Sequence, residues 1–284
     1  MNERKHNGSL IGLKWLASMI LLFAFVAPTH AQVALPNSLT IANHSIQASV
    51  TLSDNIAVDI TVEFENSIGL HANNIDVQAT LLSPTDPSIV DRLPSSLINA
   101  DNAFPVLVSI SPKSDAGFGF EGVAMIELYT TALHYVEGTP LRLFRSHDNG
   151  EFEDITMLTA SGSFRARGNT GSFSDFIILA DMRSLNVVLD EKFNALSNVL
   201  ATNRHNIKNA LLQPIDVAMG SLYTAISLQN YAMALTQVDT LIGLIQPASG
   251  NNIPDVWRSA GDIINVKGEL LTHLYTLRYS LRTN

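Results

Sequence analysis

The chain has 284 residues, no cysteine and a formal net charge of −9. The absence of cysteine excludes a disulfide framework, a zinc–thiolate site and a thiol nucleophile. The excess of acidic residues disfavours binding to nucleic acids, because phosphates repel such a surface.

The first 31 residues are typical of a cleavable secretory signal peptide, with a basic start, an apolar run at 16–27 and small residues after it. The run is shorter than the about 20 residues that a bilayer-spanning helix needs. We expect cleavage between Ala31 and Gln32, and a secreted or periplasmic bacterial protein without stable membrane insertion. The leader carries three basic residues and one acidic residue, so residues 32–284 have a net charge of −11.

Residues 32–184 alternate between apolar and polar side chains, which predicts β-strands. The clearest case is Ile56, Val58, Ile60, Val62 and Phe64, which place one apolar row on one face of a strand. Further strands are expected near 46–52, 75–81, 106–110, 119–130, 140–146, 151–158 and 173–180. Many short strands without helical patterns between them predict an antiparallel β-sandwich of the Ig-like or jelly-roll-like kind.

Residues 185–284 change to the period of amphipathic helices. The first apolar stripe contains Leu185, Leu189, Phe193, Leu196 and Leu200. Later stripes lie at 215–226, at 231–242 and from Pro254 to Leu281. The short connections predict an antiparallel bundle of three or four helices. The sequence therefore predicts two domains, a β-sandwich at 32–184 and a helical bundle at 185–284.

A glycine run from Gly117 to Gly122 matches the G-x-G-x-x-G pattern of dinucleotide-binding loops. That motif requires a helix after it, because the helix N-terminus binds the pyrophosphate. The residues at 123–129 are typical of a strand instead. We therefore interpret the glycines as a flexible or bulged start of a strand.

An acidic segment offers oxygen ligands of the kind that calcium prefers, with Asp148, Glu151 and Asp154 as the candidate ligands. The segment lacks the alternating acidic spacing of an EF-hand. A hairpin turn at Asn149 and Gly150 followed by a solvated edge explains it as well and is preferred. Apart from this possible calcium ion, no cofactor is expected.

Arg142, Arg145, Arg165 and Arg167 form the one basic concentration in the acidic half. If each pair projects from one sheet face, the arginines could bind an anionic ligand. Salt bridges to the surplus Asp and Glu residues explain the same pattern, and we prefer that interpretation.

Three aromatic residues, Trp257, Tyr231 and Tyr223, fall on or beside the apolar helical stripes. Packing within the core of the helical bundle is the expected role of such residues. An exposed aromatic docking patch is the alternative.

Two parts of the chain resemble known families. The sequences P-L-R-L-F-R at 140–145, F-E-D-I-T at 152–156 and F-S-D-F-I-I at 173–178 resemble the closing strands of sandwich domains in exported bacterial proteins. Tyr231, Leu235 and the turn at Ser249 and Gly250 resemble the FIMAH-type helical modules of secreted bacterial proteins. These resemblances imply an uncharacterised exported bacterial family with a sandwich and a bundle, and they carry over no catalytic residue.

No catalytic constellation stands out in the sequence. We expect a non-enzymatic protein that binds or scaffolds a protein or glycan of the cell envelope. The alternative is a hydrolase or lyase of an extracellular polysaccharide, using carboxylates such as Glu121, Glu127 and Asp154. Glycoside hydrolysis would require two carboxylates about 5–10 Å apart across an open cleft.

Overall fold

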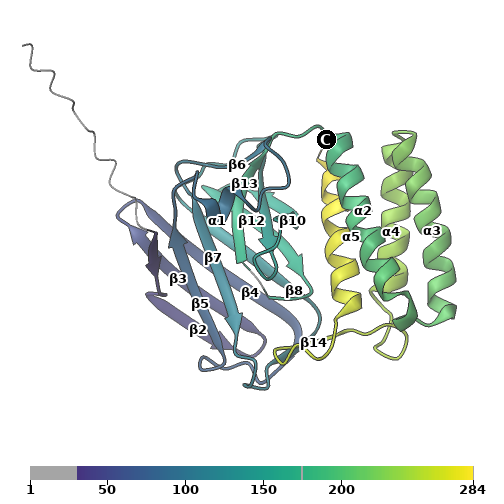
Figure 1. The fold of residues 1–284 in the computed structure, drawn as a ribbon, viewed down its shortest axis with the longest axis horizontal. Coiled ribbons are helices and arrows are strands. Elements are labelled where there is room, and N and C mark those ends of the chain that lie inside the picture. Colours follow the sequence, from purple (N-terminus) through teal and green to yellow (C-terminus); the bar gives the residue numbers. More distant parts are fainter. Residues whose placement is uncertain (1–30, 174, 284) are drawn as a thin grey trace, which may run out of the picture.

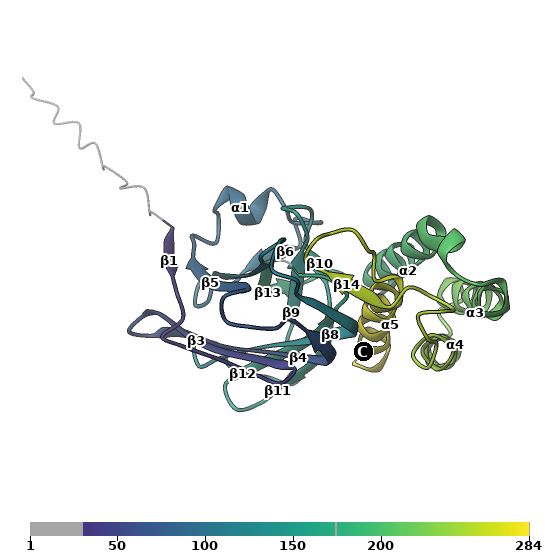
Figure 2. The same ribbon diagram turned by 90° about the horizontal axis from the view of Figure 1, so that it is seen from below.

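The computed structural model describes residues 31–173 and 175–283, which form two β-sheets and five α-helices (Figures 1 and 2). The predicted leader lies outside the described residues, except for Ala31. The first strand begins at Gln32, directly after the predicted cleavage point. None of the helices in the described ranges combines the length and the apolar character needed to cross a membrane.

The first sheet has seven strands in the order β1-β5-β7-β13-β9-β10, with β6 also paired to β13. All the pairs are antiparallel. The strands are β1 (Gln32–Ala34), β5 (Ile75–Leu81), β6 (Ile98–Ala100), β7 (Val106–Pro112), β9 (Leu141–Ser146), β10 (Glu153–Asp154) and β13 (Asp175–Asp181).

The second sheet also has seven strands, in the order β11-β12-β8-β4-β3-β2, with β14 paired to β8. These pairs are antiparallel too. The strands are β2 (Ser38–Ala42), β3 (Ser45–Ser53), β4 (Ile56–Ile68), β8 (Gly119–Thr130), β11 (Thr156–Ala160), β12 (Phe164–Thr170) and β14 (Val256–Arg258).

The alternation in the sequence correctly predicts which side chains fill the core. In β4, Val58, Ile60, Val62 and Phe64 are buried, whereas the polar residues between them are exposed or half-buried. They belong to one cluster with inward-facing residues of β5, β7, β9 and β13 from the first sheet. The two sheets therefore share a core, as expected for sheets with one apolar face each.

Strand β13 is apolar on both faces, and the structure explains why. Phe176 and Ile178 join the core shared by the two sheets. Ile177 and Leu179 face the other way, into a smaller cluster with Ile89 of the short helix α1 (Pro87–Val90). A strand covered on both sides must carry a continuous apolar run, because neither face meets water.

Four longer helices follow β13, with β14 between the last two. Helix α2 packs against α5, α3 packs against α4, and α4 packs against α5. Helix α5 also contacts β8, β11 and β12, and it is the helix nearest to the second sheet (Figures 1 and 2). Their apolar residues form a cluster of their own, joined by Val123 of β8. The helices are α2 (Leu185–Asn203), α3 (Asn209–Ser227), α4 (Tyr231–Ile245) and α5 (Val266–Arg282), with a 3₁₀ turn at Arg204–Asn206 after α2.

The predicted start of the last helix near Pro254 is wrong. Residues 256–258 form β14 at the second sheet, and α5 begins only at Val266. The expected position of Trp257 in the helical core is also wrong, because its side chain packs against the core shared by the sheets. The apolar spacing misled the prediction because the half-buried Trp257 packs on the core shared by the sheets from a strand and not from a helix. The division into two domains stays a prediction.

The glycine run forms a bulged strand, as expected, and no helix follows it. Gly122 has a φ of +68° and lies at a register shift between β4 and β8. The bulge receives the start of α5: the Asn265 Nδ2 donates to the Gly122 carbonyl at 2.5 Å, and the Asn265 Oδ1 accepts from the Gly268 N–H at 2.8 Å. The side chain of Asn265 therefore caps α5 and joins it to the sheet.

Gly268 allows this close approach, since a Cβ there would lie 2.4 Å from the Gly122 carbonyl oxygen. We expect Gly268→Ala to lower the free energy of unfolding by about 1–3 kcal/mol through overpacking. The matched change Gly243→Ala, in α4 where a Cβ meets no atom within 4 Å, should raise it by up to about 1 kcal/mol through helix propensity. Urea denaturation measures both, and a gain in both variants would contradict the account.

Candidate functional site

The four arginines singled out in the sequence do not gather at one site. Arg165 and Arg167 of β12 both form ion pairs with Glu127 of the neighbouring strand β8. Arg145 of β9 pairs with Glu269 of α5 at 2.5 Å. Salt bridges therefore account for three of the four arginines, and Arg142 is the exception.

The structure does not bring the three candidate calcium ligands together. Asp148 lies in the turn after β9 with its side chain 89% exposed, whereas Asp154 is buried against α2. Glu151 is exposed between them. Within residues 31–173 and 175–283, no group of three or more His, Cys, Asp or Glu side chains is placed to hold a metal ion.

The hairpin turn differs from its predicted form by one residue. The positive φ values fall at Asp148 (48°) and Asn149 (57°), and the Gly150 N–H donates to the His147 carbonyl at 2.8 Å. This is a type I′ turn with Asp148 and Asn149 at its centre. Gly150 follows the turn and does not have a positive φ.

A buried lysine occupies the contact between the first sheet and the helices. Lys192 of α2 donates from Nζ to the Asp154 carboxylate at 2.6 Å, and to the hydroxyls of Thr276 and Ser280 on α5 at 2.7 and 2.8 Å. Burial lowers the pKa of Lys192, and the Asp154 carboxylate opposes that shift. The ammonium group is thus fully hydrogen-bonded, which a buried cation requires.

The F-E-D-I-T sequence positions Asp154 for this role. One carboxylate oxygen, Oδ1, accepts from the backbone N–H of Thr156 at 2.8 Å and from its hydroxyl at 2.6 Å. The other, Oδ2, faces Lys192. These local hydrogen bonds orient the carboxylate towards Lys192, so the Asp-x-Thr pattern is a positioning device.

A second buried ion pair lies beside the first. Arg145 binds both carboxylate oxygens of Glu269, at 2.5 and 3.2 Å, and also donates to Glu153 at 3.3 Å. Burial disfavours the guanidinium cation, but Glu269 and Glu153 overcome it and raise the pKa of Arg145. Burial alone would raise the pKa of Glu269, yet Arg145, with help from Ser172, holds it below its usual range. We call Arg145, Asp154, Lys192 and Glu269 the helix–sheet interface.

His273 of α5 completes this buried polar region. It is 5% exposed, and its pKa is lowered by burial and by the Arg145 cation. The carboxylates of Glu153 and Glu269 act in the opposite direction but do not outweigh the burial. The imidazole is therefore held in its neutral form at the helix–sheet interface.

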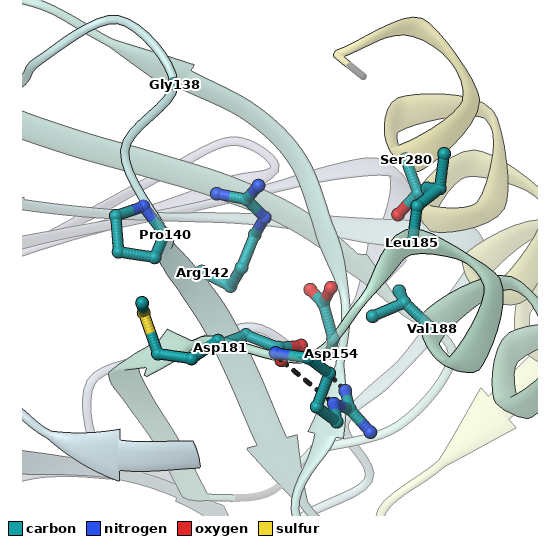
Figure 3. Close-up of a pocket in the computed structure, with 10 residues that line it drawn as sticks. Gly138, Pro140, Arg142, Asp154, Asp181, Leu185, Val188 and Ser280 are labelled. Atoms are coloured by element: carbon teal, nitrogen blue, oxygen red, sulfur yellow. Dashed lines mark hydrogen bonds and ion pairs between the residues drawn. The ribbon is translucent and has the colours of Figure 1, made fainter. Parts of the chain in front are cut away.

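A cavity of about 230 Å³ opens at one end of the helix–sheet interface (Figure 3). Arg142 of β9, Asp154 of β10 and Ser280 of α5 line it, and the Asp154 carboxylate lies between the other two side chains in the view. Arg183 and Asp181 pair with each other at 2.7 Å on its wall. We call this space the interface cavity.

Arg142 differs in its pairing from the other charged residues that line the interface cavity. Asp154 is matched by Lys192, and Asp181 is matched by Arg183, which also pairs with Glu191 outside the cavity. The Arg142 guanidinium lies 5.3 Å from the Tyr279 ring and donates from Nη1 to two backbone carbonyls. None of the described carboxylates pairs with it, so its remaining donors can bind an anion.

The carboxylates considered for catalysis are occupied or separated. Glu127 is held by two arginines and Asp154 by Lys192, whereas Glu121 accepts from Asn66 at 3.1 Å beside β14. Asp154 and Glu121 line different cavities. The structure therefore assigns these three acids to separate polar contacts.

Sequence reasoning missed Lys192, Glu269 and His273. Lys192 lies one residue before Phe193 of the apolar stripe, and His273 lies among the leucines of α5. A charged residue beside a predicted buried stripe was the available signal, but it does not indicate the partner.

A sequence model for one protein family, described as "Family of unknown function (DUF6689)", matches residues 19–284. The chain belongs to that family. The match to DUF6689 runs through both sheets and all the described helices, so the helix–sheet interface lies wholly within it. A comparison with curated proteins found no match.

Substitution of the buried Lys192 tests how much the helix–sheet interface contributes to stability. Lys192→Met leaves the Asp154 carboxylate buried and unpaired, so we expect a loss of about 3–5 kcal/mol in the free energy of unfolding. Lys192→Met combined with Asp154→Asn should recover most of that loss. Urea denaturation of the single and double variants measures it, with the exposed Arg204→Gln as a control that leaves stability nearly unchanged. Equal losses in the single and double variants would rule out a charge effect.

His273 predicts how stability depends on pH. Its pKa in the folded protein lies below the ordinary value of 6.5, so the unfolded chain binds the proton more readily between these two values. The free energy of unfolding should fall as the pH drops through the ordinary value of 6.5 towards the lower folded-state pKa, by at most about 1.4 kcal/mol per pH unit. His273→Gln should flatten this slope, and the exposed His134→Gln should not. A slope that His273→Gln leaves unchanged would assign the effect elsewhere.

Proposed function

We propose that the protein is an exported, non-enzymatic binding protein of the bacterial cell envelope that holds a ligand with an acidic group in the interface cavity. The observation that carries the proposal is Arg142, a half-buried guanidinium without a carboxylate partner among the described residues. An arginine with free donors in a cavity is a fitting partner for a planar carboxylate, because the two can form parallel hydrogen bonds.

Export is supported by the leader-like pattern of the first 31 residues and by the start of the first strand at Gln32. Cleavage after Ala31 would remove the leader without disturbing a described strand. The proposed location is the periplasm or the cell exterior.

The proposal includes a finer architecture, a β-sandwich followed by a four-helix bundle. Two observations support this architecture. Residues of both sheets form one core cluster, and residues of the four longer helices form another. The resemblance to closing strands of exported sandwich domains and to FIMAH-type helical modules points the same way. Such a rigid arrangement suits a binding protein, since a preformed cavity loses little entropy when a ligand enters.

A uronic acid fits the proposed site, because it combines a carboxylate with the hydroxyls of an envelope glycan. Wild-type protein from Gln32 onward should bind glucuronic acid and its oligomers, while glucose, which lacks the carboxylate, should bind more weakly. Arg142→Gln should weaken uronate binding about tenfold or more, because one charge-assisted pair is lost. Isothermal titration calorimetry measures these affinities.

The control for this test is Arg204→Gln, which makes the same change of charge at an exposed pair with Asp216. It should bind uronates like the wild type. Absence of uronate binding by the wild-type protein, or an equal loss in both variants, would overturn the proposed ligand and the role of Arg142.

A further inference from the structure

A second cavity, of about 290 Å³, lies between β7, the turn after β9 and the segment around β14. It shares no lining residue with the interface cavity. Its wall combines two aromatic side chains with several hydrogen-bonding groups. The lining residues include Ser111, Asp148, Asn149, Phe173, Trp257 and Ser259. We call it the Trp257 cavity.

The aromatic wall of the Trp257 cavity is rigid. The Trp257 ring stacks on Phe120 with centroids 5.4 Å apart and meets the edge of Phe173 at 5.3 Å. Its backbone is fixed by pairing of β14 with β8. Trp257 is nevertheless only half-buried, so part of the indole remains available at the cavity. A large apolar surface is thus presented without the cost of ordering a flexible side chain.

The polar rim comes from the type I′ turn. Glycine suits the positive φ values of such a turn best, yet Asp148 and Asn149 occupy both central positions. Asp and Asn tolerate this backbone and add an acceptor and an amide next to Trp257. The carboxylate of Asp148 remains 89% exposed, in contact with His147 at 3.4 Å. The turn therefore holds two hydrogen-bonding side chains at the cavity.

A buried serine hydroxyl, that of Ser259, also favours a ligand at the Trp257 cavity. Its hydroxyl is buried and has no hydrogen-bond partner among the described residues. Buried hydroxyls in folded proteins are nearly always hydrogen-bonded, so a hydroxyl without a partner among the described residues can gain a hydrogen bond from a bound water or ligand. Ser259 lines the Trp257 cavity, where a ligand hydroxyl or a water molecule can reach that wall.

We infer that the Trp257 cavity binds a neutral saccharide unit. A pyranose ring has an apolar C–H face that packs on an aromatic ring, and hydroxyls that both donate and accept hydrogen bonds. Asp148 can accept, while Asn149, Ser111 and Ser259 can do both. Among the described residues, Asp148 and Asp175 line the cavity and no Lys or Arg does, so an anionic ligand is disfavoured there. The volume lies near the lower end of the range of small-molecule sites, which suits a single sugar unit.

This site is separate from the proposed uronate site, and the two can be tested independently. Tryptophan fluorescence reports on it directly, because the chain has two tryptophans and Trp15 lies in the predicted leader. In protein from Gln32 onward, titration with cellobiose, maltose or diacetylchitobiose should give a saturable change of Trp257 emission. Arg142→Gln should leave this change intact, so that failure of one site does not imply failure of the other.

The decisive variant is Asp148→Gly with Asn149→Gly. Glycine favours the positive φ values, so the melting temperature should stay equal or rise, while disaccharide affinity should fall about tenfold or more. Asn43→Gly is the matched control, since Asn43 has a φ of 52° in the turn between β2 and β3. It should bind disaccharides like the wild type.

Three results would overturn the inference: no disaccharide changes the emission of Trp257, the double glycine variant binds like the wild type, or Asn43→Gly loses affinity equally. Choline serves as a competing probe, because an aromatic ring beside a carboxylate can also bind a quaternary ammonium group. Saturable binding of choline in place of the disaccharides would assign the cavity to cationic ligands instead.

Discussion

The fold depends on two buried ion pairs, Lys192 with Asp154 and Arg145 with Glu269. Removing such charges from water is costly, and their attraction offsets that cost only when further hydrogen bonds complete their surroundings. Those bonds come from hydroxyl groups of β12, of the loop after it and of α5. The helices therefore have one favourable position on the sheets, because any shift would leave a charge buried without a partner.

Helix α5 shows what this constraint demands of a sequence. Its leucines, such as Leu270, Leu274 and Leu277, face the other helices. Gly268 and Thr276 are buried too, at the sheet bulge and beside Lys192. The helix is thus buried on nearly all sides while carrying many polar residues, a pattern that a simple amphipathic stripe does not have. It belongs to two cores at once, one apolar and one hydrogen-bonded.

These properties decide how much the sequence could predict. Strand β4 and helix α2 were predicted correctly, because a core on one side imposes a period that is visible in a short window. The start of α5 and the position of Trp257 were not, since they depend on the bulge at Gly122 of a distant strand. The ion pairs were also out of reach, because Arg145 and Glu269 are 124 residues apart in the sequence. A charge indicates that it needs a partner, but it does not indicate which one.

The hairpin formed by β9 and β10 connects the helix–sheet interface with both cavities. Its strands carry Arg142 and Asp154 at the interface cavity, while its turn carries Asp148 and Asn149 at the Trp257 cavity. The strands are fixed by the buried ion pairs, whereas the turn extends beyond them into solvent. A short acidic segment thus divides into an internal part, which positions the helices, and an external part, which is available to a ligand. The charges buried in the first part stabilise the scaffold on which the second part is presented.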